Sequence, residues 1–312
     1  MDISEKINLQ LDDDFFKEEV RCEFLVTETT KKIWAIELDL LNELIRVCEK
    51  HKIKMCVWAG TLLGTIRHKG MIPWDDDIDV CLSREEYEKL CKIAPYEFKH
   101  PYFFQNYKTD PQYLIGYSRL RNSLSTGYVV GEDSSNYNNG IYIDIFVLDG
   151  LTDNESLLRK QLRKQNKLML LYNLYNKNVY SRNRINSYLK HGLSILMHAT
   201  LFNFIDRQKI LNAYDNNLKK YNQTATRLSM VTHPLDFAKK YWIAAKDMEN
   251  LIFMPFESIM VPVPSNYKEI LTHIYGNFME FPPIEKRGVW HEGVIKFDPD
   301  IPYKENIHAK FL

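Results

Sequence analysis

The segment IKMCVWAGTLLGTIRHKGMIPWDDDIDVCL, residues 53–82, contains the pattern from which we predict the fold class and the site. Three aspartates occupy every second position near its end: Asp75, Asp77 and Asp79. Side chains on a strand alternate between faces, so we expect these three to project to one side and Asp76 to the other. The neighbouring residues are apolar: Ile78, Val80 and Leu82. The segment therefore predicts a strand that enters a core.

Three carboxylates on one face of a strand repel one another, and ordinary folding does not reward that arrangement. A divalent cation removes the repulsion, because Mg²⁺ prefers several oxygen ligands in an octahedral arrangement. We therefore predict a site for Mg²⁺, with Mn²⁺ as an alternative. A solvated acidic turn is the competing interpretation, and the apolar flanks of the segment argue against it.

The residues before the aspartates predict a strand, a turn and a short helix. Apolar side chains at alternate positions favour a half-buried strand: Ile53, Met55 and Val57. Ala59-Gly60 lets the chain turn, and Thr61 is expected to cap a helix that runs to about Arg67. The N-terminus of such a helix presents free N–H groups, which bind anions. A phosphate site beside a metal site is the arrangement that phosphoryl transfer uses.

A further acidic residue, Asp144, lies in the segment GIYIDIFVL, residues 140–148, which reads as a strand. It is the only charged residue of an otherwise apolar stretch. A buried carboxylate without a partner is costly, so Asp144 needs a metal, a role as a base or a cationic partner. A simple salt bridge to an arginine is the competing interpretation.

The stretch GTLLGTIRHKGMIPWDDDIDV, residues 60–80, resembles the signature of the LicD family, which belongs to the nucleotidyltransferase-fold superfamily and is similar to the fukutin-related proteins. Three further segments match the family: YSRLR (117–121), GIYIDIFVLDG (140–150) and IYGNFMEFPPIEKRGVWHEG (274–293). The resemblance extends from about residue 35 to residue 293, with a poorly matched stretch in the middle.

The resemblance implies a Mg²⁺-dependent phosphotransferase. It would transfer phosphocholine from CDP-choline to a hydroxyl of a cell-surface glycan or lipid-linked glycan, such as teichoic acid, lipopolysaccharide or a capsule precursor, and release CMP. Glycerol, ribitol or ethanolamine phosphate from another CDP-activated donor is an open alternative. A non-catalytic nucleotide- or metal-binding protein on the same fold is a second one, although the retained acidic residues argue against it.

The resemblance also assigns roles to individual residues. The expected catalytic residues are Asp77, Asp79 and Asp144, and with Asp75 they would hold the metal. Asp144 is also the candidate base for the acceptor hydroxyl. The expected substrate-binding residues are Gly60, Thr61, Gly64, Arg67, Arg119, Arg121, Lys286, Arg287 and His291. If choline is transferred, its cation needs an aromatic cage, for which the candidates are Tyr128, Tyr142, Phe146 and Trp290.

The predicted fold is mixed α/β (α+β), with a nucleotidyltransferase-type mixed sheet flanked by helices. We divide the chain into an N-terminal extension (1–30), a catalytic core (31–150), a helical region (151–245) and a C-terminal segment (246–312) that completes the substrate site. Apolar periodicity predicts a helix over 32–51 and strands over 102–107, 113–121 and 124–130. Ser83 and Ser265 are expected to cap the helices that follow them.

The composition excludes several classes of protein. Lys plus Arg equals Asp plus Glu at 41 each, so no net charge attracts nucleic acid. Five cysteines without a CxxC pair predict free thiols and no structural zinc site. No signal peptide or membrane-length apolar run is apparent, so we expect a cytoplasmic protein. Peripheral contact of residues 189–207 with the inner face of the plasma membrane is left open, as is the oligomeric state.

Overall fold

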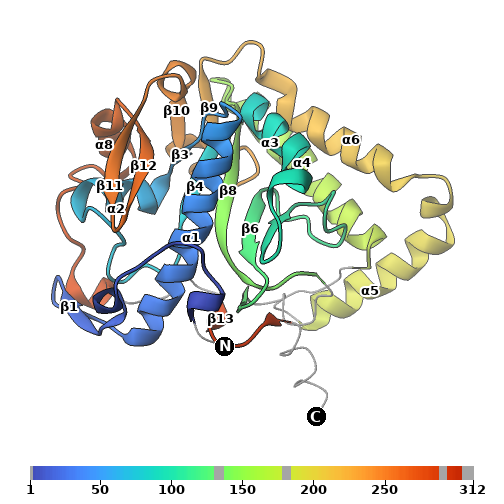
Figure 1. Ribbon diagram of the computed structural model, residues 1–312. Helices are drawn as coiled ribbons and strands as arrows, with labels where there is room; N and C mark the ends of the chain where they lie inside the picture. The colour runs from blue at the N-terminus through green and yellow to red at the C-terminus, as the bar shows by residue number, and fades with distance from the viewer. Residues whose placement is uncertain (1–2, 130–136, 178–183, 288–293, 304–312) are drawn as a thin grey trace.

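A computed structural model describes residues 3–129, 137–177, 184–287 and 294–303 (Figure 1). Its centre is a mixed sheet of seven strands, which confirms the predicted fold class. The strand order is β10-β9-β8-β4-β3, and β6 pairs with β8 and with β5. The strands are β3 (Cys56–Val57), β4 (Asp79–Ser83), β5 (Tyr102–Gln105), β6 (Ser118–Asn122), β8 (Ile141–Gly150), β9 (Arg227–Ser229) and β10 (Trp242–Ala244).

Strand β8 is the middle of this sheet, and all ten of its residues are buried. It runs parallel to β4 and antiparallel to β6. A strand that is covered on both faces and paired on both edges needs a nearly continuous apolar sequence, which Ile141–Gly150 supplies apart from its two aspartates, Asp144 and Asp149. The position of Asp144 is therefore fixed by the most constrained element of the fold.

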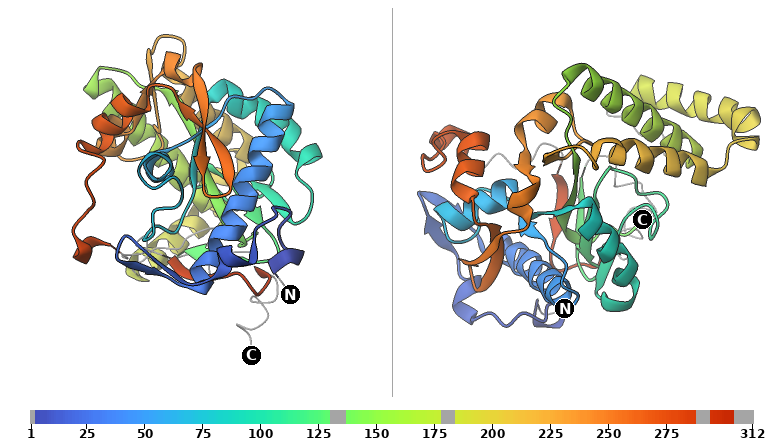
Figure 2. Two further views of the ribbon diagram at one scale, coloured as in Figure 1. Left: turned by 60° about the vertical axis from the view of Figure 1, so that its left-hand side comes forward. Right: turned by 90° about the horizontal axis from the view of Figure 1, so that it is seen from above.

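Helices cover both sides of the sheet (Figure 2). Helix α1 (Glu28–Lys50) contacts β8 and β6 on one side, and the side-chain oxygen of Thr27 caps it by accepting from the N–H of Thr30. Helix α2 (Ala59–Arg67) precedes β4, and α3 (Arg84–Glu97) follows it. Ser83 caps α3 as predicted, because its Oγ accepts from the N–H of Glu86.

The helical region forms a second apolar cluster beside the sheet. It consists of α4 (Glu155–Tyr175), α5 (Arg184–Ala199) and α6 (Arg207–Leu218), and α4 contacts both of the others. Buried side chains such as Leu158, Tyr172 and Tyr214 hold these helices together. The chain then returns to the central sheet through β9, α7 (Leu235–Lys240) and β10.

The remaining segments close the fold around the main core. Strands β11 (Leu251–Phe256) and β12 (Ile259–Pro264) form a hairpin that leads to α8 (Tyr267–Tyr275). Strand β13 (Val294–Asp298) pairs with β7 (Thr126–Val129), and β1 (Glu19–Arg21) pairs with β2 (Phe24–Val26). The N-terminal segment packs on the core through Val26, which is fully buried. The five cysteines are free, and no helix among the described residues is long and apolar enough to cross a membrane.

Several local predictions were wrong in detail. The acidic strand begins at Asp79 instead of near Asp75, because its register with β8 starts there. Thr61 is not the cap of α2; Trp58 precedes the helix, and the Oγ1 atom of Thr61 accepts from the N–H of Asp79 instead. Residues 113–117 do not join β6, and α8 begins after Asn266, so Ser265 does not cap it.

Candidate active site

Three carboxylates converge where β4 lies beside β8. The register places Asp79 opposite Asp144, and Asp77 precedes β4 on the same side as Asp79. One oxygen of each of the three lies within 4.8 Å of the others. The predicted alternation is confirmed, since Asp77 and Asp79 are partly exposed while Asp76 and Ile78 are buried. Three carboxylate oxygens at this separation are a donor set that suits a hard divalent cation such as Mg²⁺.

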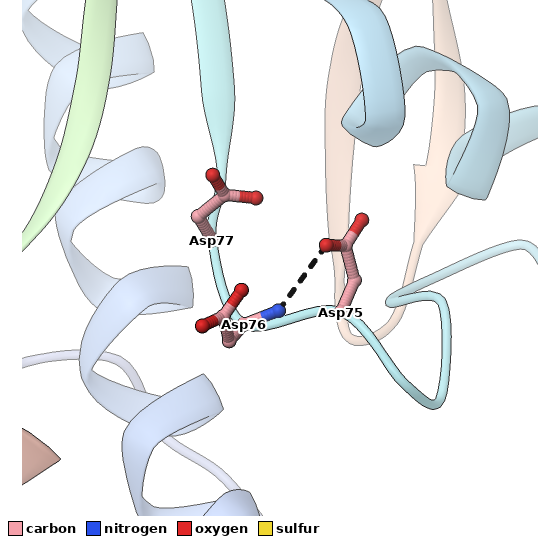
Figure 3. A group of neighbouring side chains, drawn as sticks. All are labelled: Asp75, Asp76 and Asp77. Atoms are coloured by element: carbon pink, nitrogen blue, oxygen red, sulfur yellow. Dashed lines mark hydrogen bonds between the residues drawn. The ribbon is translucent and has the colours of Figure 1, made fainter. Parts of the chain in front are cut away.

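A second acidic group shares Asp77 with the first. Ligand oxygens of Asp75, Asp76 and Asp77 also lie within 4.8 Å of one another. Figure 3 shows these side chains, with the N–H of Asp76 donating to Oδ1 of Asp75 at 3.3 Å. A Cβ atom at Gly60 would lie 2.9 Å from Oδ2 of Asp75. The glycine therefore gives Asp75 room to approach the start of α2.

Two hydrogen bonds to the backbone of Asp79 fix the start of β4 against α2. The side chain of Thr61 bonds to the N–H of Asp79 at 2.8 Å, and the N–H of Trp58 donates to the carbonyl of Asp79 at 2.9 Å. Both Trp58 and Thr61 are buried. The backbone at Asp79 is thus held from both directions, which keeps its carboxylate pointing toward β8.

Asp144 forms an ion pair as well as belonging to the acidic cluster. Nε of Arg119 donates to Oδ1 of Asp144 at 2.8 Å, and both side chains are almost completely buried. The Arg119 guanidinium lies 3.6 Å from the ring centroid of Tyr142. Asp144 can therefore form a salt bridge and also belong to the metal site. The arginine offsets part of the negative charge that the three converging carboxylates bring together.

Glu37 is an acidic residue of this region that the sequence analysis missed. It lies on α1, it is fully buried, and neither carboxyl oxygen has a hydrogen-bond partner within the described part of the chain. Burial raises its pKa well above the usual value, and the charges of Asp77, Asp76 and Asp75 raise it further. The sequence contains a signal for the burial of Glu37. This residue follows Ile33 by four positions, so helical spacing places it on the apolar face of α1.

A cavity of about 670 Å³ opens over the acidic cluster. Asp75, Asp77, Asp79 and Asp144 line it together, so the structure places all four predicted metal ligands at one surface. Its walls come from α2, α7, α8 and the segment after α8. Such a recess holds a molecule of nucleotide size more readily than an open acidic surface would.

The predicted substrate-binding residues divide into two groups. Gly60 and Arg67 line the cavity, and Arg67 donates to the backbone carbonyls of Phe278 and Glu280. Thr61 and Gly64 are buried and lie outside the cavity lining. A Cβ atom at Gly64 would lie 2.6 Å from the carbonyl oxygen of Gly70, so this glycine serves close contact between two segments.

The cationic residues also differ in position. Arg121 is fully buried and donates to Gln105 and to the carbonyls of Gly127 and Gly140, so its predicted role at the substrate is replaced by a structural one. Arg287 lies 4.9 Å from the ring centroid of Trp74, which lines the cavity. Lys286 is exposed.

The candidate cage residues lie in different places. Phe146 lines the cavity, whereas the ring of Tyr142 is buried under Arg119 and Arg121. Two predicted residues, His291 and Trp290, lie outside the described residues, as does the side chain of Tyr128.

Comparison with known proteins confirms the family resemblance. Residues 52–167 match the family described as LicD/FKTN/FKRP, nucleotidyltransferase domain. The lipopolysaccharide cholinephosphotransferase LicD of Haemophilus influenzae is 28% identical over 254 residues, which cover 81% of this chain and 92% of that protein. An uncharacterized protein of Rickettsia prowazekii is 39% identical over 56 residues, covering 18% of this chain and 21% of that protein.

Replacement of Glu37 should stabilise the protein in a pH-dependent way. The unfolded chain loses the Glu37 proton near pH 4.5, the ordinary pKa of a glutamate, whereas the folded protein retains it. The free energy of unfolding therefore falls as pH rises above that value. Glu37→Gln removes this loss. We therefore expect the variant to be more stable than the wild type at pH 7, with a gain that grows as pH rises above 4.5.

Urea unfolding from pH 4 to pH 8 measures this effect, and the gain should vanish at the acidic end. Glu49→Gln, at an exposed position of the same helix, is the matched control and should follow the wild type throughout. A Glu37→Gln profile parallel to that of the wild type would show that Glu37 is ionised in the folded protein.

Divalent cations should stabilise the wild type through the acidic cluster. Mg²⁺ or Mn²⁺ is expected to raise the melting temperature, because it removes repulsion among Asp77, Asp79 and Asp144. Asp77→Asn should melt at or above the metal-free wild type and should lose most of the cation-dependent increase. Asp236→Asn, on the short helix α7, is the control and should keep that increase. An equal increase in all three proteins would place the cation elsewhere.

Proposed function

We propose that this protein, which carries a LicD-family nucleotidyltransferase domain, transfers phosphocholine from CDP-choline to a hydroxyl of a cell-surface glycan and releases CMP. The acceptor is a lipopolysaccharide, teichoic acid or capsule precursor, free or lipid-linked. The observation that carries the proposal is the convergence of Asp77, Asp79 and Asp144 at the floor of a cavity large enough for a nucleotide. The name of the Haemophilus influenzae relative supports lipopolysaccharide as the acceptor.

The reaction exchanges one phosphorus–oxygen bond for another. The acceptor oxygen forms a bond to the phosphorus that carries choline, the bond from that phosphorus to the CMP oxygen breaks, and the hydroxyl proton passes to a base. Such transfers depend on position and charge neutralisation more than on covalent chemistry. Mg²⁺ or Mn²⁺, held by Asp75, Asp77, Asp79 and Asp144, would supply neutralisation of the diphosphate.

Arg67 and Arg287 provide positive charge at one wall of the cavity. Arg67 is anchored by two backbone carbonyls, and Arg287 donates to the carbonyls of Pro282 and Cys22. Both side chains are held in place before any ligand arrives, so little side-chain entropy is lost when they meet a phosphate. We assign them to the diphosphate and to the CMP that leaves.

Asp144 is the proposed base, although it also forms an ion pair with Arg119. The Arg119 guanidinium, which donates to Oδ1 at 2.8 Å, offsets the negative charge of this carboxylate. The same contact with Arg119 fixes the position of Asp144, and a base must lie within about 3 Å of the proton that it accepts. The fixed position of Asp144 favours its role as the base, whereas its negative charge favours its role as a metal ligand.

The main alternative is the same reaction with a glycerol, ribitol or ethanolamine phosphate donor. A non-catalytic nucleotide- or metal-binding protein is a second alternative. Such a protein would bind the cation and CDP-choline at the same carboxylates without releasing CMP.

We further infer a cytoplasmic protein in peripheral contact with the inner face of the plasma membrane. Leu189, Ile195 and Leu196 of α5 are each more than half exposed, and a helix with such a face can rest on a lipid surface.

Paired variants separate the two roles of Asp144. Asp79→Asn should weaken CDP-choline binding in Mg²⁺ and lower turnover, because it removes a ligand of the cation that contacts the diphosphate. Asp144→Asn should leave donor affinity within a few fold and lower turnover by roughly 10²–10⁴, the usual worth of a general base. The measurements are donor dissociation constants by calorimetry and CMP release with a glycan acceptor.

Circular dichroism and melting temperature control for folding in both variants. Equal loss of donor binding in the two variants would make Asp144 a metal ligand of the same kind as Asp79. Normal CMP release by both variants would contradict the proposed site altogether.

A further inference from the structure

The cavity over the acidic cluster has two aromatic walls that differ in charge. The neutral aromatic wall consists of Tyr117, Phe146, His233 and Phe237, from the residue before β6, from β8 and from the segment around α7. The cationic aromatic wall consists of Arg67, Trp74, Phe281 and Arg287. Members of both walls line the same cavity as Asp75, Asp77, Asp79 and Asp144.

The rings of the neutral aromatic wall contact one another in series. Tyr117 lies 4.8 Å from Phe146 between ring centroids. The His233 imidazole stacks on Tyr117 at 5.8 Å and on Phe237 at 5.3 Å, and it meets Phe146 edge-on at 5.6 Å. The faces and edges of four rings are therefore fixed by their neighbours, and a ligand need not order them.

This wall carries no net positive charge of its own. Burial lowers the pKa of His233 to about 4, so its imidazole is neutral at pH 7. The Arg119 guanidinium lies 5.8 Å from the Tyr117 centroid, but it is paired with Asp144 at 2.8 Å. Lys240 is exposed and lies over Tyr241 and Tyr275, two further rings of the cavity. Tyr241 stacks on Phe237 at 4.3 Å, so one ring separates this cation from the wall. The carboxylates of the cavity floor add negative potential beside the rings.

The cationic aromatic wall is different, because its ring faces already carry cations. Arg287 lies 4.9 Å from the Trp74 centroid and 5.4 Å from that of Phe281, and Arg67 lies 5.2 Å from Phe281. A further cation there would meet two guanidinium groups. A phosphate would pair with those groups, and a planar base would stack on the rings.

We propose that the neutral aromatic wall binds the quaternary ammonium of the transferred group, and that the cationic aromatic wall binds the nucleotide end of the donor. This assignment rests on the proposed function and fixes the direction in which the donor crosses the acidic floor. Quaternary ammonium ions are attracted to aromatic faces and cannot donate hydrogen bonds. A primary ammonium is strongly hydrated, so it loses more on entering a wall of rings. The wall therefore selects choline over ethanolamine.

The test is equilibrium binding to the full chain in Mg²⁺, which needs no acceptor. CDP-choline, CDP-ethanolamine and CMP are titrated by calorimetry into the wild type, Phe237→Leu, Phe237→Tyr and Phe281→Leu. Phe237 and Phe281 are matched sites, because they belong to different walls of one cavity and are 41% and 44% exposed. Leucine keeps an apolar side chain without a ring, whereas tyrosine keeps the ring.

Phe237→Leu should weaken CDP-choline binding by about 3- to 30-fold, the range of one cation–π contact. It should weaken CDP-ethanolamine binding less and leave CMP within about twofold. Phe237→Tyr should retain the wild-type preference for choline. Phe281→Leu should weaken all three ligands by a similar factor, because they share the nucleotide.

Equal loss of both CDP donors in Phe237→Leu, or loss of CMP binding in that variant, would overturn the assignment. So would a wild type that binds CDP-ethanolamine as tightly as CDP-choline. CMP release with a glycan acceptor tests the proposed function separately. Turnover of CDP-choline that Phe237→Leu leaves unchanged would overturn the wall and keep the function. Selective binding of CDP-choline without turnover would keep the wall and overturn the function.

Discussion

The parallel pairing of β4 with β8 is the constraint on which the site depends. Its register sets Asp79 opposite Asp144, although the two residues are far apart in sequence. The contact of Thr61 with the backbone of Asp79 fixes β4, and the complete burial of β8 fixes Asp144. A shift of one residue would turn one of these carboxylates to the other face of the sheet. The acidic cluster is therefore a consequence of the register between two strands, and it does not depend on the position of a loop.

Concentrated negative charge is the cost of this arrangement, and its neighbours offset part of that cost. Arg119 pairs with Asp144, and the raised pKa of Glu37 keeps a further buried carboxyl uncharged. What remains is a site that is strained without a cation and that a divalent ion relieves. The negative charge of these carboxylates also favours a positively charged group at the neutral aromatic wall. The same carboxylates therefore contribute to binding of both the metal and the choline head group.

The sequence was sufficient for features that depend on local alternation. It located Asp77 and Asp79 on one side of the chain, placed Asp144 inside a buried strand and predicted the mixed sheet. It failed where tertiary register decides. Arg119 and Arg121 share one face of β6, yet the first lies opposite Asp144 and the second opposite Tyr142. His233 and Phe237 come from a segment without a recognisable pattern, so their meeting with Phe146 could not be predicted.

An anomalous-scattering map of crystals grown with Mn²⁺ and CDP-choline tests the central claim most directly. The account predicts a peak about 2.0–2.1 Å from carboxylate oxygens of Asp77 and Asp79, with Asp144 at the edge of the metal shell and the donor diphosphate close by. Asp77→Asn crystals should show a weaker peak under the same conditions. A peak that contacts none of the three carboxylates, or a bound donor whose diphosphate lies away from them, would contradict the account.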